Sequence, residues 1–413
     1  MPHLPPVERI ELSWKNYKVR LIAAAVFLVA GVWLLARSVV GLFGTDPGWQ
    51  TIETSSGAED NCASDFTFLY ELGAGELSAA TEKRALTEAY TEAAVTAYRL
   101  FSASENFAGV TNVCDLNRHP NEVLTVDEAL YEAFALLERY GDRSVYLGPV
   151  YEIYDGLFSC EEDWQTIDFD PYVNPDIAAF YAEAAAYVRD PESVNVELLG
   201  DGQVRLHVSE EYLSFAKNSD TTRFLDFYWL TNAFIADYLA QTLSGQGYTH
   251  GTLTSYDGFI RNLDSREMTY ALDLYDREGQ VVYPAAVMRY QGPESIVYLR
   301  GYPAVGQDAW RFYRTDSGEI RTAYVDTADG LCKSAADDLI CYSGAAGCGE
   351  TLLRMIPIYV ADALQIEKLS ELAADGVYAV WPEERALYHT DPDLVLTDLY
   401  SGETAIYVDR LIR

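Results

Sequence analysis

The residues best placed to do chemistry follow Phe224, where the sequence reads FLDFYWLTNAFIADYLAQTLSGQG. A short apolar segment turns at Asp226 into an amphipathic helix. Such junctions hold phosphates or cofactors in many proteins, because the first turn of a helix presents free N–H groups. Here the junction carries Tyr228 and Trp229, and Asn232 follows in the first turn. Large rings keep a ligand away from the backbone, so the turn either grips a ligand in an unusual way or is packed shut.

The aromatic residues near this junction have two interpretations. Tyr228, Trp229, Tyr151 and Tyr154 could form a platform for a planar or sugar ligand, because rings offer flat faces and polar tips. They could instead fill the cleft, since an empty cleft lined by apolar groups is costly. We favour filling.

No other pattern in the sequence indicates a known catalytic site, and we assign no catalytic residue. The Gly-rich stretch CYSGAAGCGE lacks the Lys-Ser/Thr of a P-loop, and no Gly-x-Ser-x-Gly elbow occurs. Most of the histidines are scattered, with no spacing that suggests partners: His119, His207, His250 and His389.

The charge of the chain excludes one class of partner. Its 413 residues include 29 Lys and Arg against 64 Asp and Glu, which gives a formal net charge of −35. Such a surface repels the phosphates of nucleic acids and of anionic lipids. We therefore expect no nucleic-acid partner, and we interpret the acidity as a solvated surface.

The N-terminal part predicts attachment to a membrane. Residues 19–43, VRLIAAAVFLVAGVWLLARSVVGLF, are apolar over enough length for a transmembrane signal anchor. Basic residues precede this segment and acidic residues follow it, so residues 1–18 are predicted in the cytoplasm. A linker over residues 44–65 then leads to an extracytoplasmic domain over residues 66–413.

All six cysteines lie after the predicted anchor, where an oxidising compartment permits disulfides. Cys332, Cys341 and Cys348 are close enough for a local disulfide. Single buried thiols are an equal alternative, and the spacings match no zinc pattern.

Helices and strands mix without a strict βαβ alternation, which predicts one α+β domain. Helices are predicted over 76–102, 125–141, 174–190, 226–245 and 350–376. Thr125 is the expected N-cap of the second helix and Gly141 its end. Alternating patterns predict strands over 194–209, 251–263, 268–279, 295–303, 311–325 and 377–390.

Several of these pieces, in this order, resemble the ApbE-type FAD:protein FMN transferases, from about Ala79 to Pro392. The segment GVTNVCDLNRHPNEVLTVDEALYEAFALLERYG looks like that family's Asn-bearing segment and first conserved helix. GDRSVYLGPV is in register with Gly-Ala-Phe-Asp-Pro-Thr-Ile-Gly-Pro-Leu, with matches at Gly141, Gly148 and Pro149. The resemblance implies an α+β domain of the T-fold type that uses Mg²⁺ to move FMN from FAD to a Ser or Thr of a partner protein.

The positions that would face the cofactor are the ones that differ. The stretch from Asp226 is in register with Asp-Leu-Gly-Gly-Ile-Ala-Lys-Gly-Tyr-Ala-x-Asp, and Asp226 and Asp237 match. Tyr228 and Trp229 replace the two glycines, and Asn232 replaces the lysine.

In the two downstream motifs, too, some residues match the family while others that would face the cofactor or the metal differ. In VGQDAWRFYRTDSGEIRTAYVDTADG, Arg311 and Asp326 match, whereas Ala323 takes the place of a histidine. In VADALQIEK, which is similar to the family's metal-holding helix, Asp362 matches but Ile366 replaces the threonine ligand. Because Mg²⁺ prefers several oxygen ligands in near-octahedral geometry, a single retained aspartate provides too few ligands for such a site.

Two hypotheses follow. The first is a degenerate, non-catalytic binding or assembly module at the cell membrane, with no cofactor and with an envelope protein or a small ligand as partner. The alternative is an active Mg²⁺-dependent FAD:protein FMN transferase with a divergent site. In that case Asp362 would bind the metal, and the cofactor would contact Asp226, Tyr228, Trp229, Asn232, Asp257 and Arg311. We favour the first.

Overall fold

The computed structural model describes residues 45–55, 65–303, 311–399 and 407–412. The anchor predicted over residues 19–43 lies outside these ranges. Within them, no helix combines the length and apolar character needed to cross a membrane.

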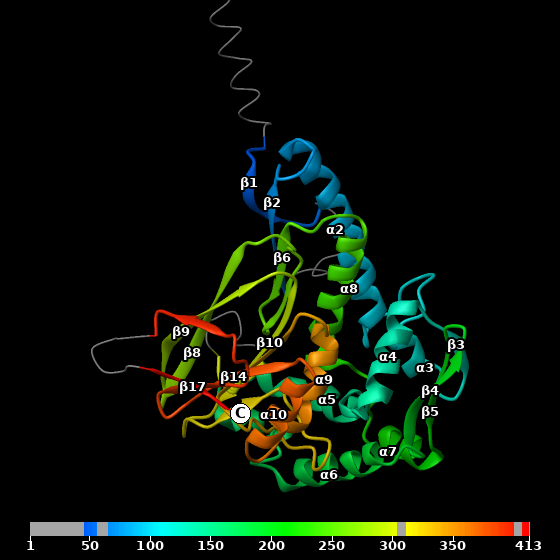
Figure 1. Ribbon diagram of the computed structural model, residues 1–413. Coiled ribbons are helices and arrows are strands. Elements are labelled where there is room, and N and C mark those ends of the chain that lie inside the picture. The colour runs from blue at the N-terminus through cyan, green and yellow to red at the C-terminus, as the bar shows by residue number, and fades with distance from the viewer. Residues whose placement is uncertain (1–44, 56–64, 304–310, 400–406, 413) are drawn as a thin grey trace, which may run out of the picture.

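A large mixed sheet forms the centre of the fold (Figure 1). Its strands, in spatial order, are β1 (Gly48–Ile52), β2 (Phe66–Leu72), β6 (Gly251–Ser255), β7 (Phe259–Asn262), β10 (Glu294–Arg300), β13 (Asp338–Ser343), β14 (Tyr378–Glu383), β15 (Ala386–His389) and β17 (Val408–Leu411). Neighbouring strands are antiparallel, except that β15 and β17 are parallel. Strand β1 therefore comes from the segment predicted as a linker, and it extends the sheet by one strand.

The two faces of this sheet bury different layers, because successive side chains of a strand point to opposite faces. On β10, Val297 and Leu299 join the main core, whereas Ile296 and Tyr298 join a second, smaller core. The helices α2 (Ala79–Phe101), α8 (Thr231–Gly245) and α9 (Cys348–Tyr359) cover the first face. Figure 1 shows α2 and α8 side by side along it.

A small antiparallel sheet covers the second face. It consists of β16 (Val395–Thr397), β9 (Val281–Gln291) and β8 (Thr269–Glu278), in that order. Met288 and Leu274 from this sheet are fully buried in the second core. The molecule therefore has three layers: helices, large sheet and small sheet.

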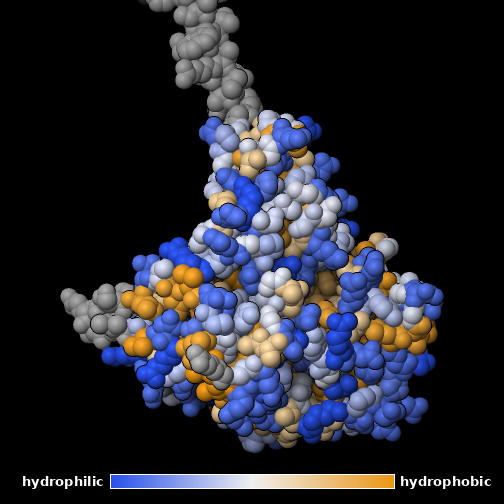
Figure 2. Space-filling model, viewed as in Figure 1, coloured by the Kyte–Doolittle hydropathy of each residue, from blue (hydrophilic) through white to orange (hydrophobic). Residues whose placement is uncertain are grey.

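The remaining elements extend the helical side. They are α3 (Val113–Arg118), β3 (Val123–Thr125), α4 (Glu128–Tyr140), α5 (Gly148–Tyr154), α6 (Pro175–Arg189), β4 (Val194–Gly200), β5 (Gln203–Val208), α7 (Glu210–Asn218), β11 (Phe312–Arg314), β12 (Ile320–Thr322) and α10 (Ile366–Ala374). Figure 2 shows hydrophilic side chains over most of the visible face, with apolar patches over the β8–β9 side and the β3–β5 side.

Helix ends follow the capping residues, with one correction. Ser78 and Asn174 accept N–H groups at the starts of α2 and α6, and Gly141 ends α4 in the left-handed conformation. The N-cap predicted at Thr125 is wrong, because Asp127 caps α4 and Thr125 ends β3. An aspartate two residues further along the chain offers a side-chain oxygen as acceptor, and Thr125 itself belongs to the strand.

The helix predicted over residues 350–376 is also wrong, because it is two helices. The first, α9, contains Pro357 and ends at Tyr359, and the second, α10, begins at Ile366. Proline lacks an N–H and disturbs the preceding turn, and Val360 leaves the helical region with ψ of 67°. Asp362 therefore lies in the loop between two helices rather than on a helix.

The five described cysteines are free thiols, so of the two alternatives for Cys332, Cys341 and Cys348, a local disulfide or single thiols, the structure has the single thiols. Burial raises the pKa of Cys341 and of Cys348 far above the usual thiol range. They pack as small apolar residues. Cys62 lies outside the described residues.

Candidate functional site

The junction that follows Phe224 is held in place before it reaches α8. The buried Asn117 side chain accepts the N–H groups of Phe224 and Leu225, both at 2.9 Å, and donates to the Leu225 carbonyl at 2.7 Å. The Asp226 N–H donates to the Val145 carbonyl at 2.7 Å. These bonds replace strand pairing and fix the direction in which the chain enters the turn.

Tyr228 adopts a backbone conformation that favours glycine. Its φ is +45°, in the left-handed region, where a side chain costs about 1–2 kcal/mol. Its N–H donates to Asp226 at 2.8 Å, its ring stacks on Tyr151 with centroids 4.4 Å apart, and its hydroxyl donates to Asp155 at 3.1 Å. The turn thus keeps a glycine-like backbone while a tyrosine stands there, held by contacts of its ring.

The aromatic side chains fill the space beside this turn. Trp229 and Tyr154 are each 1 % exposed and Tyr151 is fully buried. The Trp229 ring packs edge-on against Tyr324 at 5.0 Å. The cavity that remains, lined by Asp257, Arg311 and Tyr324 among others, measures about 10 Å³. That is about one water, whereas cofactor sites measure hundreds of Å³.

Four of the predicted cofactor residues come together, and they bind one another. The Asn232 amide donates to the carboxylates of Asp65 and Asp257, each at 3.0 Å. Arg311 Nη1 lies 2.8 Å from Asp257 Oδ2 and donates to the Trp229 carbonyl at 3.4 Å. Both charged side chains are nearly buried, at 10 % exposed for Arg311 and 6 % for Asp257. The protein's own carboxylates thus occupy donors that a phosphate would otherwise use.

Burial dominates the electrostatics of this cluster. It raises the pKa of Asp257 above its usual range, although the Arg311 guanidinium works in the opposite direction. Asp226 lies apart from this pair and contacts Arg223 at 3.2 Å, and burial raises its pKa as well. In each case the neighbouring arginine opposes the effect of burial on the pKa of the acid.

The residues around Asp362 do not fit the divalent ion that the resemblance implies. Asp362 is 89 % exposed, and its Oδ1 lies 3.4 Å from Lys333 Nζ. The same ammonium lies 2.8 Å from Asp326 and 2.8 Å from Asp329. Ile366 begins α10 and supplies no oxygen. Among the described residues, no group of three or more His, Cys, Asp or Glu is placed to hold a metal. A lysine ammonium is thus the cation on which these carboxylates converge.

Lys333 was missed by the sequence reasoning, although a signal was present. Val325 pairs with Cys332 in an isolated bridge, so the intervening turn returns Lys333 to the side of Asp326. The left-handed Gly330, at φ +76°, permits this turn. Reading VDTADGLCK as a tight turn would have placed the lysine beside the acid.

Asp237, which the resemblance also marked, holds two helices together. Its carboxylate accepts the N–H groups of Cys348 and Gly349 at 2.8 Å each, where α9 begins. A side chain at Gly347 would collide with it, since an added Cβ would lie 2.4 Å from Asp237 Oδ2. Asp237 on α8 therefore caps α9 from outside, which is a structural role.

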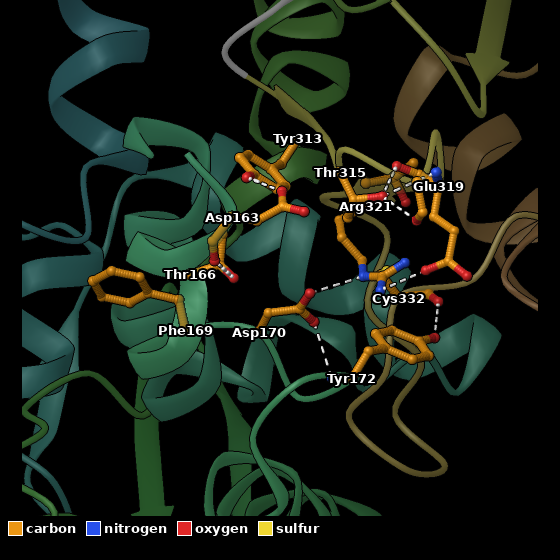
Figure 3. A network of polar contacts seen from close by, with 12 residues as sticks. Asp163, Thr166, Phe169, Asp170, Tyr172, Tyr313, Thr315, Glu319, Arg321 and Cys332 are labelled. Carbon is orange, nitrogen blue, oxygen red and sulfur yellow. Dashed lines mark hydrogen bonds and ion pairs between the residues drawn. The ribbon is translucent and has the colours of Figure 1, made fainter. Parts of the chain in front are cut away.

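A second polar network fixes the hairpin β11–β12, which follows Arg311 directly. Figure 3 shows Arg321 between Asp170 and Glu319, each at 3.0 Å, with its guanidinium 4.2 Å from the centre of the Tyr172 ring. The Tyr172 hydroxyl donates to the Cys332 carbonyl at 2.8 Å. Ala323, at the histidine position of the resemblance, is buried just after β12. These contacts tie the hairpin to the segment that contains Asp170 and Tyr172.

Comparison with known proteins identifies the fold. No family model matches the sequence, and no curated protein matches it. The ApbE protein of Thermotoga maritima is similar in structure, with a TM-score of 0.53 and 14 % identity over 76 % of this chain and 90 % of that one. The flavin transferase ApbE of Vibrio cholerae is similar with a TM-score of 0.51 and 11 % identity, over 85 % of this chain and 98 % of that one.

The chain therefore has the α+β fold of the ApbE flavin transferases over most of its length, at low sequence identity. The resemblance stated from the sequence motifs is confirmed at the level of the fold. The activity of those proteins is a separate question, because a fold persists while its site changes.

Proposed function

We propose that this protein is a non-catalytic member of the ApbE fold that acts as a binding or assembly module. The observation that carries the proposal is the burial of Trp229, Tyr151 and Tyr154 at the junction, beside a cavity of only about 10 Å³ that Asp257, Arg311 and Tyr324 help to line. The polar groups nearby are engaged with one another, as in the pair of Arg311 and Asp257. A dinucleotide would have to displace packed side chains and break a buried ion pair.

The ammonium of Lys333 supports the same proposal. It satisfies Asp326, Asp329 and Asp362 with a monovalent organic cation that cannot bridge a phosphate as a metal does. The arrangement thus supports a protein that holds neither the flavin nor the metal of the family at these positions.

The decisive experiment is a flavin-transfer assay with the full-length chain. The protein is incubated with FAD, Mg²⁺ and a peptide carrying an acceptor Ser or Thr, with the Vibrio cholerae enzyme as positive control. We expect no covalent fluorescence on the peptide in a denaturing gel. Mg²⁺-dependent fluorescence on the peptide would support the alternative, an active transferase with a divergent site, and would end our proposal.

We also propose that residues 19–43 anchor the protein in the cell membrane, with the folded domain on the extracytoplasmic side. The basic residues before this segment and the acidic ones after it support that orientation. Protease added to intact cells should digest the domain if it is extracytoplasmic. Full protection in intact cells, with digestion only after lysis, would contradict the orientation.

A further inference from the structure

A second hollow lies on the opposite side of the large sheet from the junction. Its volume is about 690 Å³, within the range of small-molecule sites. It opens where the small sheet meets the ends of β10 and β13, beside the loop that follows β15. Met288 and Tyr342 belong to the second core and form part of its wall, and Tyr290, Leu394 and Val395 complete its apolar lining.

Glu294 lines this cavity without a partner. The residue is neither fully buried nor exposed, and within the described part of the chain its carboxylate takes part in no hydrogen bond or ion pair. Its acidic neighbour is Asp391, which accepts from the Tyr342 hydroxyl at 2.7 Å. Burial, reinforced by the charge of Asp391, raises the pKa of Glu294 to about 7.

The charged and titratable groups around Glu294 leave the cavity acidic. They are Arg261 on β7, Arg289 and Tyr290 on β9, Tyr342 on β13, and Asp391 and Asp393 in the loop after β15. Arg289 is engaged with Thr397 at 3.1 Å and with Asp398 at 3.5 Å. Arg261 lowers the pKa of Glu294 only partly, because it is shared with Asp237 at 3.4 Å and with Ser295. A cation bound in the cavity would balance this negative charge.

We propose that this cavity binds a primary ammonium group carried on an alkyl stem, with the N–H groups on Glu294 and Asp391 and the stem against Tyr290 and Met288. The unpartnered carboxylate requires N–H donors, which a quaternary ammonium lacks. The rings and the thioether suit a methylene chain, and a cation beside tyrosine faces gains further attraction. The ligand is either a free diamine or the lysine side chain of a protein, and the two share this chemistry.

The inference is independent of the proposed function, because it concerns the other face of the sheet. It is tested by titrating the full-length chain calorimetrically at pH 8 with cadaverine, with N-acetyl-lysine methylamide and with tetramethylammonium. We expect one saturable site for at least one of the two primary amines, with Kd about 1 mM or tighter, and tetramethylammonium at least tenfold weaker. Binding of cadaverine alone would indicate a free diamine, and comparable binding of the lysine amide a protein side chain.

Glu294→Gln should weaken amine binding about tenfold or more, because a charged hydrogen-bond partner is removed without a change of shape. Glu132→Gln, an exposed acid on α4, is the matched control and should bind as the wild type does. Circular dichroism verifies that both variants are folded.

The pH dependence adds a signature that a general loss of charge would not produce. Glu294 must be ionised to pair with an ammonium, so wild-type affinity should fall about tenfold between pH 8 and pH 6, while Glu294→Gln stays flat. The amine itself stays charged over this range. The inference is overturned by no saturable binding of either amine at 10 mM, by equal binding to Glu294→Gln, or by equal binding of tetramethylammonium (roughly the same Kd).

Discussion

The junction at Tyr228 and the cavity at Glu294 are two regions of this fold that contrast in both space and charge. At the junction the rings are buried, the cavity beside them measures about 10 Å³, and Asp257 is paired with Arg311. At the cavity about 690 Å³ stays open, and Glu294 has no partner among the residues that the structure describes. A closed site whose charges are paired serves the fold, whereas an open site with an unpaired carboxylate can gain free energy by binding a ligand. The comparison moves the search for a ligand from the place that the family suggests to the other face of the sheet.

The largest effect should come from removing the ring that closes the junction. Trp229→Ala deletes a side chain that is 1 % exposed, and we expect a loss of about 4 kcal/mol in the free energy of unfolding. Urea denaturation measures it. Tyr290→Ala at the open cavity is the comparison and should cost less, because its ring borders open space. Equal losses would remove the contrast between the two hollows.

Breaking the buried pair at the junction should have the next largest effect. Arg311→Met leaves Asp257 as a buried acid without its main counter-charge, and we expect a loss of about 3 kcal/mol. Adding Asp257→Asn should restore part of the lost stability, since the uncompensated charge is removed. If the double variant is as unstable as the sum of the two single variants, the pair does not act as a unit.

A smaller effect is expected at Lys333. Lys333→Ala leaves Asp326, Asp329 and Asp362 repelling one another, and we expect a loss of about 1 kcal/mol at low salt. The loss should shrink at high salt, because exposed charges are screened. Mg²⁺ should then raise the Tm of the variant and leave that of the wild type unchanged. A wild type that responds to Mg²⁺ as strongly would contradict the role of the ammonium.

The smallest effect concerns stability against pH at Glu294. Its pKa is raised from 4.5 to about 7 in the folded protein, so its contribution to stability is fully present below pH 4.5 and is lost as pH rises through 7. Glu294→Gln should therefore be more stable than wild type at pH 8, by about 1 kcal/mol at most given its partial exposure, and equal at pH 4. Thermal denaturation at both pH values measures this. A variant that is less stable at pH 8 would show that the carboxylate already has a favourable partner.

Sequence patterns predicted what depends on neighbours along the chain. The 3.6-residue period and the capping residues located α2, α6 and α8, and the motif order indicated the ApbE fold. The break after Tyr359 was missed because apolar periodicity continues through it, and only Pro357 indicated the interruption. Trp229 is buried, which is what the filling interpretation expects of a ring at this position.

Contacts between segments that are distant along the chain could not be predicted from the sequence. Glu294 reads as an ordinary polar residue at a strand start, and its isolation depends on a loop about a hundred residues later. The pairing of Lys333 with Asp362 likewise depends on how two loops meet. Such sites are defined by what a side chain lacks or shares in space, and no local spacing records that.

The left-handed backbone at Tyr228 has a consequence for the re-engineering of this turn. The main chain there still follows a path suited to a residue without a side chain, with φ at +45°. Reopening the turn would thus require smaller side chains on the existing backbone rather than a new backbone path.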